Sequence, residues 1–139
     1  MIPASEAALV PLVSDDDVLE RVTVLVGHGI RRQAWLMFLD DENRQLPLLM
    51  PTDLPRKPRR DDAHRFAEFL SDLVEVVDAA AVVLTLERPA SEELTEADLA
   101  WLRMMRSGCR IAGVRLRGPL LAHRSGVRWI AADDLGIDE

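Results

Sequence analysis

The stretch AAAVVLTLERPAS, residues 79–91, decides how the rest of this 139-residue chain is interpreted. Residues 79–86 form a continuous apolar run of strand length, which is typical of a strand that is covered on both faces. The polar stretch 87–94 follows at once and predicts a loop. Sheets of this kind present ligands where a buried strand ends, so the charged pair Glu87 and Arg88 draws attention first.

The segment downstream of this strand continues with a helix and two strands. The helix begins at Thr95, and its buried side is formed by Leu99, Leu102 and Met105. Residues 113–123 predict a strand, and residues 127–131 predict the last one. Arg124-Ser125-Gly126 joins these two strands as a tight hairpin.

The segment upstream supplies two more strands and a second helix. Residues 34–39 are apolar on both faces and predict a covered strand, and residues 46–50 return as its partner after the polar turn 40–45. Asp61 or Asp62 then caps an amphipathic helix. The inward side of this helix is formed by Phe66, Phe69, Leu70, Leu73, Val74 and Val77.

The amino-terminal part divides into a loose arm, residues 1–14, and the start of a single domain, residues 15–139. The arm is expected to pack through Leu9, Val10, Leu12 and Val13. Asp15 or Asp16 could cap a helix over about residues 16–28, although its valines also permit a strand. Strands alternating with helices predict an α/β protein with one layered mixed β-sheet flanked by helices.

Composition limits the classes of function. The formal charge of −7 argues against general binding to nucleic acid or to a membrane surface. Cys109 is the only cysteine, so the chain has no intrachain disulfide and no thiolate cluster, which suits a reducing cytoplasm. The amino terminus does not resemble a signal peptide, and no apolar run is long enough to span a membrane. A soluble, cytoplasmic protein is expected.

One local basic segment goes against the acidic balance. It consists of Arg56, Lys57, Arg59 and Arg60. Asp61 and Asp62 follow directly and weaken its field, so we favour a solvated loop over a contact to nucleic acid.

Three patches resemble the RadC-type JAB/MPN (JAMM) domain family in their order and spacing. WLMFLDDENRQL (35–46) is similar to the family's strand–turn–strand, and residues 79–91 resemble the strand that runs into its HNHPSG motif. Residues 94–123, LTEADLAWLRMM…IAGVRLRGPLLAH, resemble its serine-x-x-aspartate helix start and LLDHLI-type strand. The resemblance covers most of residues 33–131 and implies the layered JAB/MPN (cytidine-deaminase-like) architecture.

The resemblance also implies a lost metal site. In active members two histidines and a later aspartate hold zinc, with one position open for water. Here Leu86 and Arg88 stand at the histidine positions with Glu87 between them, while Thr95 and Asp98 keep the S/T-x-x-D pattern. Leucine has no lone pair, arginine stays cationic, and one carboxylate cannot hold catalytic zinc. No cofactor is therefore expected.

These five residues, Leu86, Glu87, Arg88, Thr95 and Asp98, are the candidate pocket residues, and two of them carry alternatives. Thr95 and Asp98 also fit a capping box, which we favour over a metal or catalytic role for Asp98. Arg88 could pair with Asp98 and supply the charge that zinc once did. Alternatively, Glu87 and Arg88 form an exposed loop pair, and both interpretations stay open.

The remaining polar and aromatic residues give weaker signals. Histidines at 28, 64 and 123 are scattered and predict ordinary surface or core positions, and Cys109 predicts an inert core thiol. The glycines of GHGIRR (27–32) lack the setting of a phosphate loop. Trp101 stands off the apolar stripe of its helix, which predicts either an interface or packing against the arm.

Three functions follow from these observations. The first is a non-catalytic, metal-free interaction or scaffold domain that binds a protein partner or a second copy of itself, as a homodimer. The second is a RadC-like hydrolase or DNA-repair-associated protein that uses a remodelled pocket with Glu87, Arg88 and Asp98. The third is a small-ligand sensor that uses the same pocket. We favour the first, and with it the absence of enzymatic activity.

Overall fold

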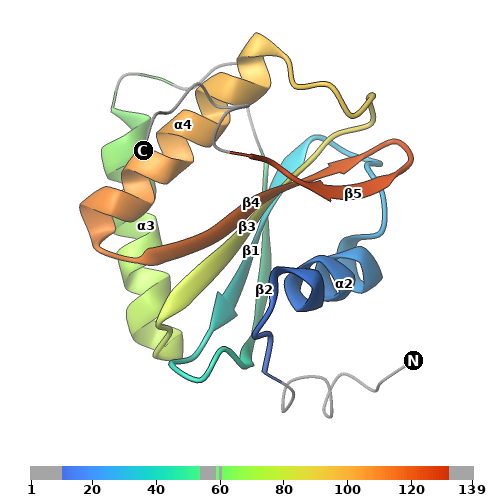
Figure 1. The fold of residues 1–139 in the computed structure, drawn as a ribbon. Coiled ribbons are helices and arrows are strands. Elements are labelled where there is room, and N and C mark those ends of the chain that lie inside the picture. Colours follow the sequence, from blue (N-terminus) through green and yellow to red (C-terminus); the bar gives the residue numbers. More distant parts are fainter. Residues whose placement is uncertain (1–10, 54–58, 60, 132–139) are drawn as a thin grey trace.

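The computed structural model describes residues 11–53, 59 and 61–131. In this part of the chain, five strands form one mixed sheet in the order β2-β1-β3-β4-β5, and three helices flank it (Figure 1). The predicted α/β class with a mixed sheet between helices is confirmed. The elements are α2 (Asp15–Val26), β1 (Gln33–Leu39), β2 (Gln45–Asp53), α3 (Asp62–Val77), β3 (Ala81–Glu87), α4 (Glu96–Ala112), β4 (Arg115–His123) and β5 (Gly126–Trp129).

The central strand is β3, as its apolar run predicts. It pairs antiparallel with β1 and parallel with β4, and all seven of its residues are buried. β2 extends the sheet beyond β1, and β5 extends it beyond β4, both in antiparallel pairing. β3 and β4 are joined by the crossover through α4, so their carboxyl ends lie at the same end of the sheet.

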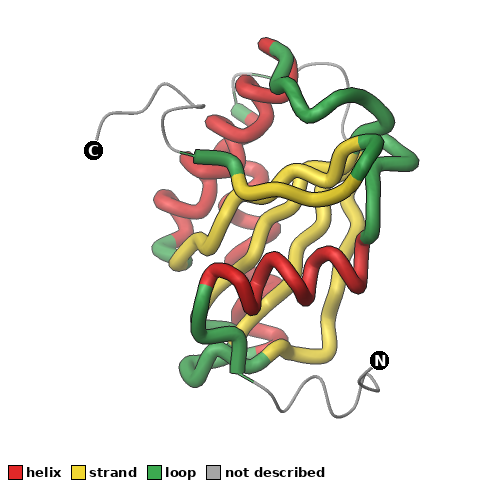
Figure 2. The backbone as a smooth tube through the Cα atoms, turned by 45° about the vertical axis from the view of Figure 1, so that its right-hand side comes forward, coloured by secondary structure: helices red, strands yellow, loops and turns green. Residues whose placement is uncertain are grey.

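Two separate cores explain why β3 is apolar on both faces. Val82, Leu84 and Leu86 belong to a core that also contains buried side chains of α3 and α4. Ala81 and Val83 belong to the other core, which α2 completes from the opposite face. Figure 2 shows α2 alone on one side of the sheet and the other two helices behind it.

Residues 15–26 form the predicted helix and not a strand, but the cap of this helix is neither Asp15 nor Asp16. The Ser14 hydroxyl accepts a hydrogen bond from the backbone N–H of Asp17, and the Asp17 carboxylate accepts one from the Ser14 N–H. This reciprocal pair satisfies two amide donors, which a cap at Asp15 could not do with this spacing. The backbone hydrogen bond from Ser14 lowers the pKa of the Asp17 carboxyl below its ordinary value.

In α3 and α4, the burial of one residue each differs from the prediction. Phe69 is 38% exposed, so its predicted place on the inward side of α3 is wrong. The fully buried residues of α3 are Ala67 and Leu70, because the helix packs mainly against α4 and presents a narrow face to it. Trp101 is only 4% exposed and lies in the core, so its predicted role at an exposed interface is wrong. α4 contacts both α3 and β4, which widens its buried face.

The arm is described only from residue 11. Leu12 is buried and donates its N–H to the Asn43 carbonyl, whereas Val13 is 71% exposed and does not pack as predicted. Leu9 and Val10 lie outside the described residues, as do three residues of the basic segment, Arg56, Lys57 and Arg60. Arg59 is described and exposed.

The edge strand β2 carries two exposed prolines, Pro47 and Pro51. Pro51 lies opposite Trp35 in the ladder with β1. A proline has no amide donor to give to a neighbouring strand, and edge positions are where sheets accommodate it. Among the described helices, none is long and apolar enough to cross a membrane.

Candidate functional site

The candidate residues lie where β3 ends, beside the carboxyl end of β4. Arg88 continues the β3–β4 ladder, since its N–H donates to the Ala122 carbonyl at 3.1 Å. Glu87 and Arg88 are each 4% exposed, so the interpretation of an exposed loop pair is wrong. Because successive strand residues point to opposite faces, the two charged side chains leave the strand on opposite sides.

Arg88 forms the predicted salt bridge with Asp98. Its Nε donates to Asp98 Oδ2 at 2.6 Å, and the two side chains are 5% and 0% exposed. Its Nη1 donates to the Ser91 carbonyl at 2.7 Å, and its Nη2 donates to the Glu93 carbonyl. Each guanidinium nitrogen therefore has an acceptor, and the loop after β3 wraps around this buried cation.

Asp98 is at once the partner of Arg88 and the cap residue of α4. Its Oδ2 accepts the Thr95 N–H at 2.9 Å while the Thr95 hydroxyl accepts the Asp98 N–H at 3.2 Å, as the capping box predicts. The second carboxylate oxygen, Oδ1, is buried and accepts no hydrogen bond. A single oxygen thus fixes both the start of α4 and the side chain that ends β3.

Glu87 is saturated on the other face of the sheet. Its Oε1 accepts from Trp35 Nε1 at 2.7 Å and from Gln33 Nε2 at 2.8 Å. Its Oε2 accepts the backbone N–H groups of Ile30 and Arg31, both at 2.9 Å. Burial by itself raises the pKa of this carboxyl, but the hydrogen bonds outweigh burial and hold the pKa below its ordinary value.

The loop after α2, residues 27–32, is held by Glu87 against the sheet end. The Gly29 N–H donates to the His123 carbonyl at 2.6 Å, and a Cβ at Gly29 would lie 2.0 Å from the Arg88 carbonyl oxygen. Only glycine allows this approach. The consecutive N–H groups of Ile30 and Arg31 could bind an anion, but the protein's own carboxylate fills that place.

The zinc site that the resemblance implies does not fit these residues. Leu86 packs in the core and offers no lone pair, Arg88 brings a fixed positive charge, and Asp98 Oδ2 already accepts two hydrogen bonds. Among residues 11–53, 59 and 61–131, no three His, Cys, Asp or Glu side chains are grouped to hold a metal ion.

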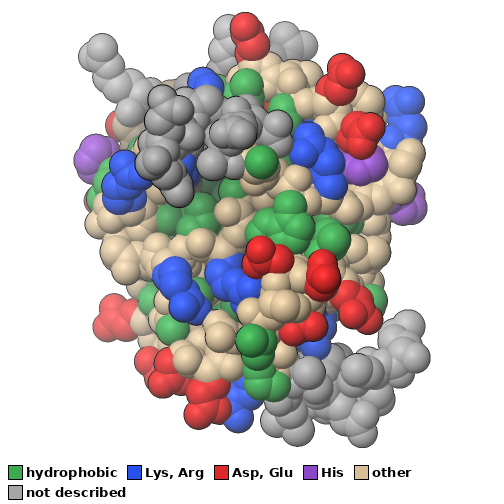
Figure 3. All heavy atoms as spheres, viewed as in Figure 1, with side chains coloured by type: hydrophobic (Ala, Val, Ile, Leu, Met, Phe, Trp, Pro, Cys, Tyr) green, Lys and Arg blue, Asp and Glu red, His purple; other side chains and the backbone are tan. Residues whose placement is uncertain are grey.

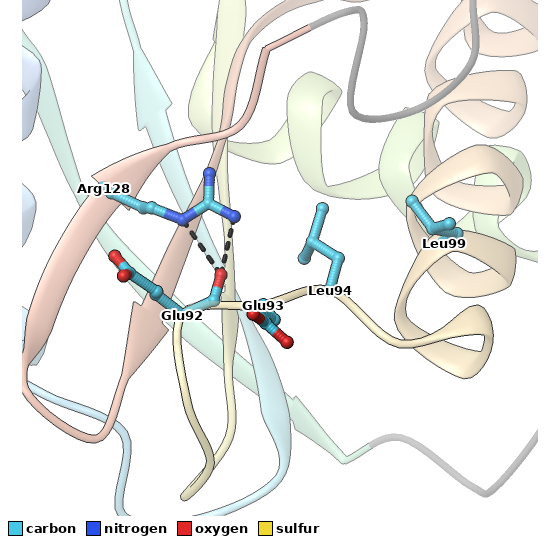
Figure 4. Close-up of a pocket in the computed structure, with 5 residues that line it drawn as sticks. All are labelled: Glu92, Glu93, Leu94, Leu99 and Arg128. Carbon is cyan, nitrogen blue, oxygen red and sulfur yellow. Dashed lines mark hydrogen bonds between the residues drawn. The ribbon is translucent and has the colours of Figure 1, made fainter.

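An open pocket of about 570 Å³ lies between β5 and the loop that precedes α4. Figure 4 shows the Arg128 guanidinium turned toward the Glu92 carbonyl, to which its Nη2 donates at 2.7 Å, while the Glu92 carboxylate points away from Leu94 and Leu99. The pocket is lined by Glu92, Glu93, Leu94, Leu99 and Arg128. None of the five candidate residues lines it.

A smaller pocket of about 260 Å³ lies on the face of the sheet that α3 and α4 cover. Its apolar lining includes Phe66, Trp101 and Met104, and its rim includes Asp53 and Arg65. The candidate residues at the end of β3 do not line this pocket either.

The structure brings Arg88, Thr95 and Asp98 together, but it separates them from Glu87 and places Leu86 in the core. Sequence reasoning did not find the donors to Glu87, namely Gln33, Trp35 and the backbone of Ile30 and Arg31. The only signal for them was alternation: Gln33, Trp35 and Glu87 share a face once β1 and β3 are known to pair antiparallel.

The histidines and the cysteine occupy unremarkable positions. His28 and His64 are exposed and His123 is half-buried, each on a different part of the fold. Cys109 is 2% exposed, and burial raises the pKa of its thiol to about 11, as expected of an inert core thiol.

No family model matches the chain, and no curated protein matches it either.

Proposed function

We propose that this chain is a non-catalytic interaction domain, related to the RadC-type JAB/MPN domains, in which an arginine has replaced the metal. The observation that carries the proposal is the buried ion pair between Arg88 and Asp98. The guanidinium holds the carboxylate, the loop after β3 and the start of α4 in one place, which is the structural part of what a metal does.

The same contacts argue against hydrolysis at this place. A general base needs a carboxylate that can reach a water or substrate proton. Both oxygens of Glu87 are taken by four donors of the protein itself. Asp98 is 0% exposed, and its Oδ2 is shared between Arg88 and the backbone. We infer that both carboxylates have a structural role, since each one joins separate segments of the chain through hydrogen bonds.

Metal analysis tests the proposal. The purified full chain should contain no stoichiometric zinc, and added zinc should not change its thermal unfolding. The variant carrying Leu86→His and Arg88→His is the matched control, since it puts two imidazoles beside Asp98 and should gain zinc affinity. About one zinc per chain in the unaltered protein would overturn the proposal.

An activity screen tests the runner-up, the hydrolase with a remodelled pocket. Peptidase and isopeptidase assays with the unaltered chain should show no turnover above buffer. Turnover that disappears in Glu87→Gln or Asp98→Asn, with folding retained, would favour the hydrolase and count against an interaction domain.

A further inference from the structure

Exposed apolar side chains gather around α2. Seven large apolar side chains are exposed in the described part of the chain, and four of them belong to this helix or its flanks. Their exposed fractions are 71% for Val13, 60% for Val24, 40% for Leu25 and 69% for Ile30. Two of the four, Val24 and Leu25, are neighbours on the helix itself. Exposed apolar side chains that lie together mark an interaction surface more often than ones scattered singly over a protein.

Ile30 is presented rigidly. Its backbone N–H is bound to the buried carboxylate of Glu87, and Gly29 next to it is seated against the Arg88 carbonyl. An apolar side chain on a fixed backbone loses little conformational freedom when a partner covers it, so it binds more tightly than one on a mobile loop.

The charges around α2 are divided along the helix. Glu20 lies one turn and Asp16 two turns before Val24 on the same exposed stripe, and Figure 3 shows acidic side chains gathered over this helix. Beyond the helix end, Arg31 is basic, and its side chain stays 66% exposed while it pairs with Asp53. Val24 and Leu25 therefore lie between an acidic half and a basic end.

This division is self-complementary under two-fold symmetry. When two copies of α2 pack antiparallel about an axis near Val24, the part before Val24 in one copy faces the part after it in the other. Asp16 and Glu20 of one copy then lie toward Arg31 of the second, and Val24 and Leu25 meet at the centre. Two parallel copies would instead bring acid against acid.

We infer that the α2 surface, defined by Val24, Leu25 and Ile30 with its acidic and basic flanks, binds a second copy of this chain. The inference rests on the proposed function in that the domain acts by binding. It adds the surface and the partner.

Analytical ultracentrifugation of the full chain tests the inference. The unaltered chain should sediment as a dimer, at twice its 15.6-kDa mass, at micromolar concentration. Val24→Asp should produce a monomer. Val76→Asp is the matched control, because Val76 on α3 is 80% exposed yet lies away from this surface, and it should leave the dimer unchanged.

A charge exchange keeps the inference testable if Val24→Asp fails to fold. Glu20→Arg alone and Arg31→Glu alone should each raise the dimer Kd about tenfold, since each change places like charges together. Their combination should restore the dimer. A monomer at all concentrations, or a combined variant no tighter than its parents, would overturn the inference.

The two proposals fail in different ways. A monomeric chain without zinc would remove self-association and leave the interaction domain standing. A dimeric chain that carries stoichiometric zinc would remove the metal-free proposal and leave the α2 surface standing.

Discussion

At position 98, one carboxylate oxygen connects two parts of the chain that are ten residues apart. Oδ2 of Asp98 receives the Arg88 Nε and the Thr95 N–H, while the whole side chain is inaccessible to solvent. A buried ion pair contributes little net stability by itself, because desolvation offsets its attraction. Its effect appears when one partner is removed and the other charge stays buried.

Asp98→Asn should therefore destabilise the protein strongly. The amide can still accept the Thr95 N–H, but the Arg88 cation loses its counter-charge, and we expect a loss of about 3–5 kcal/mol in the free energy of unfolding. Urea denaturation measures it. Glu96→Gln is the control, because Glu96 is exposed in the same helical turn and should change stability by about 0.5 kcal/mol or less.

Adding Arg88→Met to Asp98→Asn should recover part of the loss, since the unpaired buried cation disappears. If the combined variant is less stable than Asp98→Asn alone, Arg88 stabilises the fold mainly through the Ser91 and Glu93 carbonyls and not through Asp98.

Glu87 gives a pH-dependent prediction. Its pKa is lower in the folded protein than the ordinary value, so its stabilisation is present above that value and is lost as pH falls through the folded pKa. Glu87→Gln removes this titration and turns an amide donor toward other donors. The stability difference between the two proteins should be about 1–3 kcal/mol at neutral pH and shrink as the pH falls below the ordinary carboxyl pKa. A difference that stays constant over this range would contradict the prediction.

How far the sequence predicts the site depends on the distance between partners along the chain. Thr95, Asp98 and Arg88 lie within one loop and one helical turn, so local patterns are enough to predict the capping box and to suggest the salt bridge. Ile30 and Arg31 bind Glu87 from 57 and 56 residues away. Backbone donors carry no side-chain signature, so this contact follows only from the paired strands.

Among the elements, the loop between α2 and β1 depends most on one residue type. Gly29 approaches the Arg88 carbonyl so closely that a Cβ would meet its oxygen at 2.0 Å. The loop can therefore lie against the ends of β3 and β4 only because residue 29 has no side chain.

Gly29→Ala should push this loop off the sheet. Backbone atoms cannot move aside cheaply, so we expect a loss of about 1–3 kcal/mol in unfolding free energy, measured by thermal denaturation. Faster amide hydrogen exchange at Ile30 and Arg31 should accompany it. Gly113→Asn is the control, since nothing lies near a Cβ there and asparagine tolerates its positive φ of 71°. Unchanged exchange at Ile30 would mean that the loop accommodates the methyl group.

Local patterns predicted the cap of α4 but not that of α2, and they did not predict burial where helices pack on each other. Thr95 begins α4 as its pattern indicates, and Gly27 ends α2. Trp101 and Phe69 were misplaced because periodicity gives the direction of a helix face and leaves open its width. That width depends on how many neighbours the helix contacts.

In the whole molecule, the sheet separates two hydrophobic cores, one on each of its faces. One core lies between the sheet and the helices α3 and α4 and includes Cys109 of α4, and the other lies between the sheet and α2 and includes Val18 of α2. The side chains of β3 contribute to both, so loosening one core should loosen the other, which is the behaviour of a single cooperative unit.

The labelling of Cys109 by a disulfide reagent measures this coupling. The thiol is buried and its pKa is raised to about 11, so labelling at about pH 8 requires opening of the fold. Val18→Ala, in the opposite core, should cost about 2 kcal/mol and accelerate labelling roughly 30-fold. An unchanged rate would show that the two cores open independently.

The prolines on β2 have a consequence for solubility at high concentration. Pro47 and Pro51 have no amide hydrogen, so β2 cannot donate a backbone hydrogen bond at these two positions. Another extended chain therefore cannot pair continuously with the outer edge of β2. Pro51→Val would restore one such hydrogen, and fibrils detected by thioflavin fluorescence should then form sooner than with the unaltered chain. Without these prolines, only the net charge would keep copies of the protein from stacking into fibres. The outer edge of β2 thus adds a second protection against fibre formation.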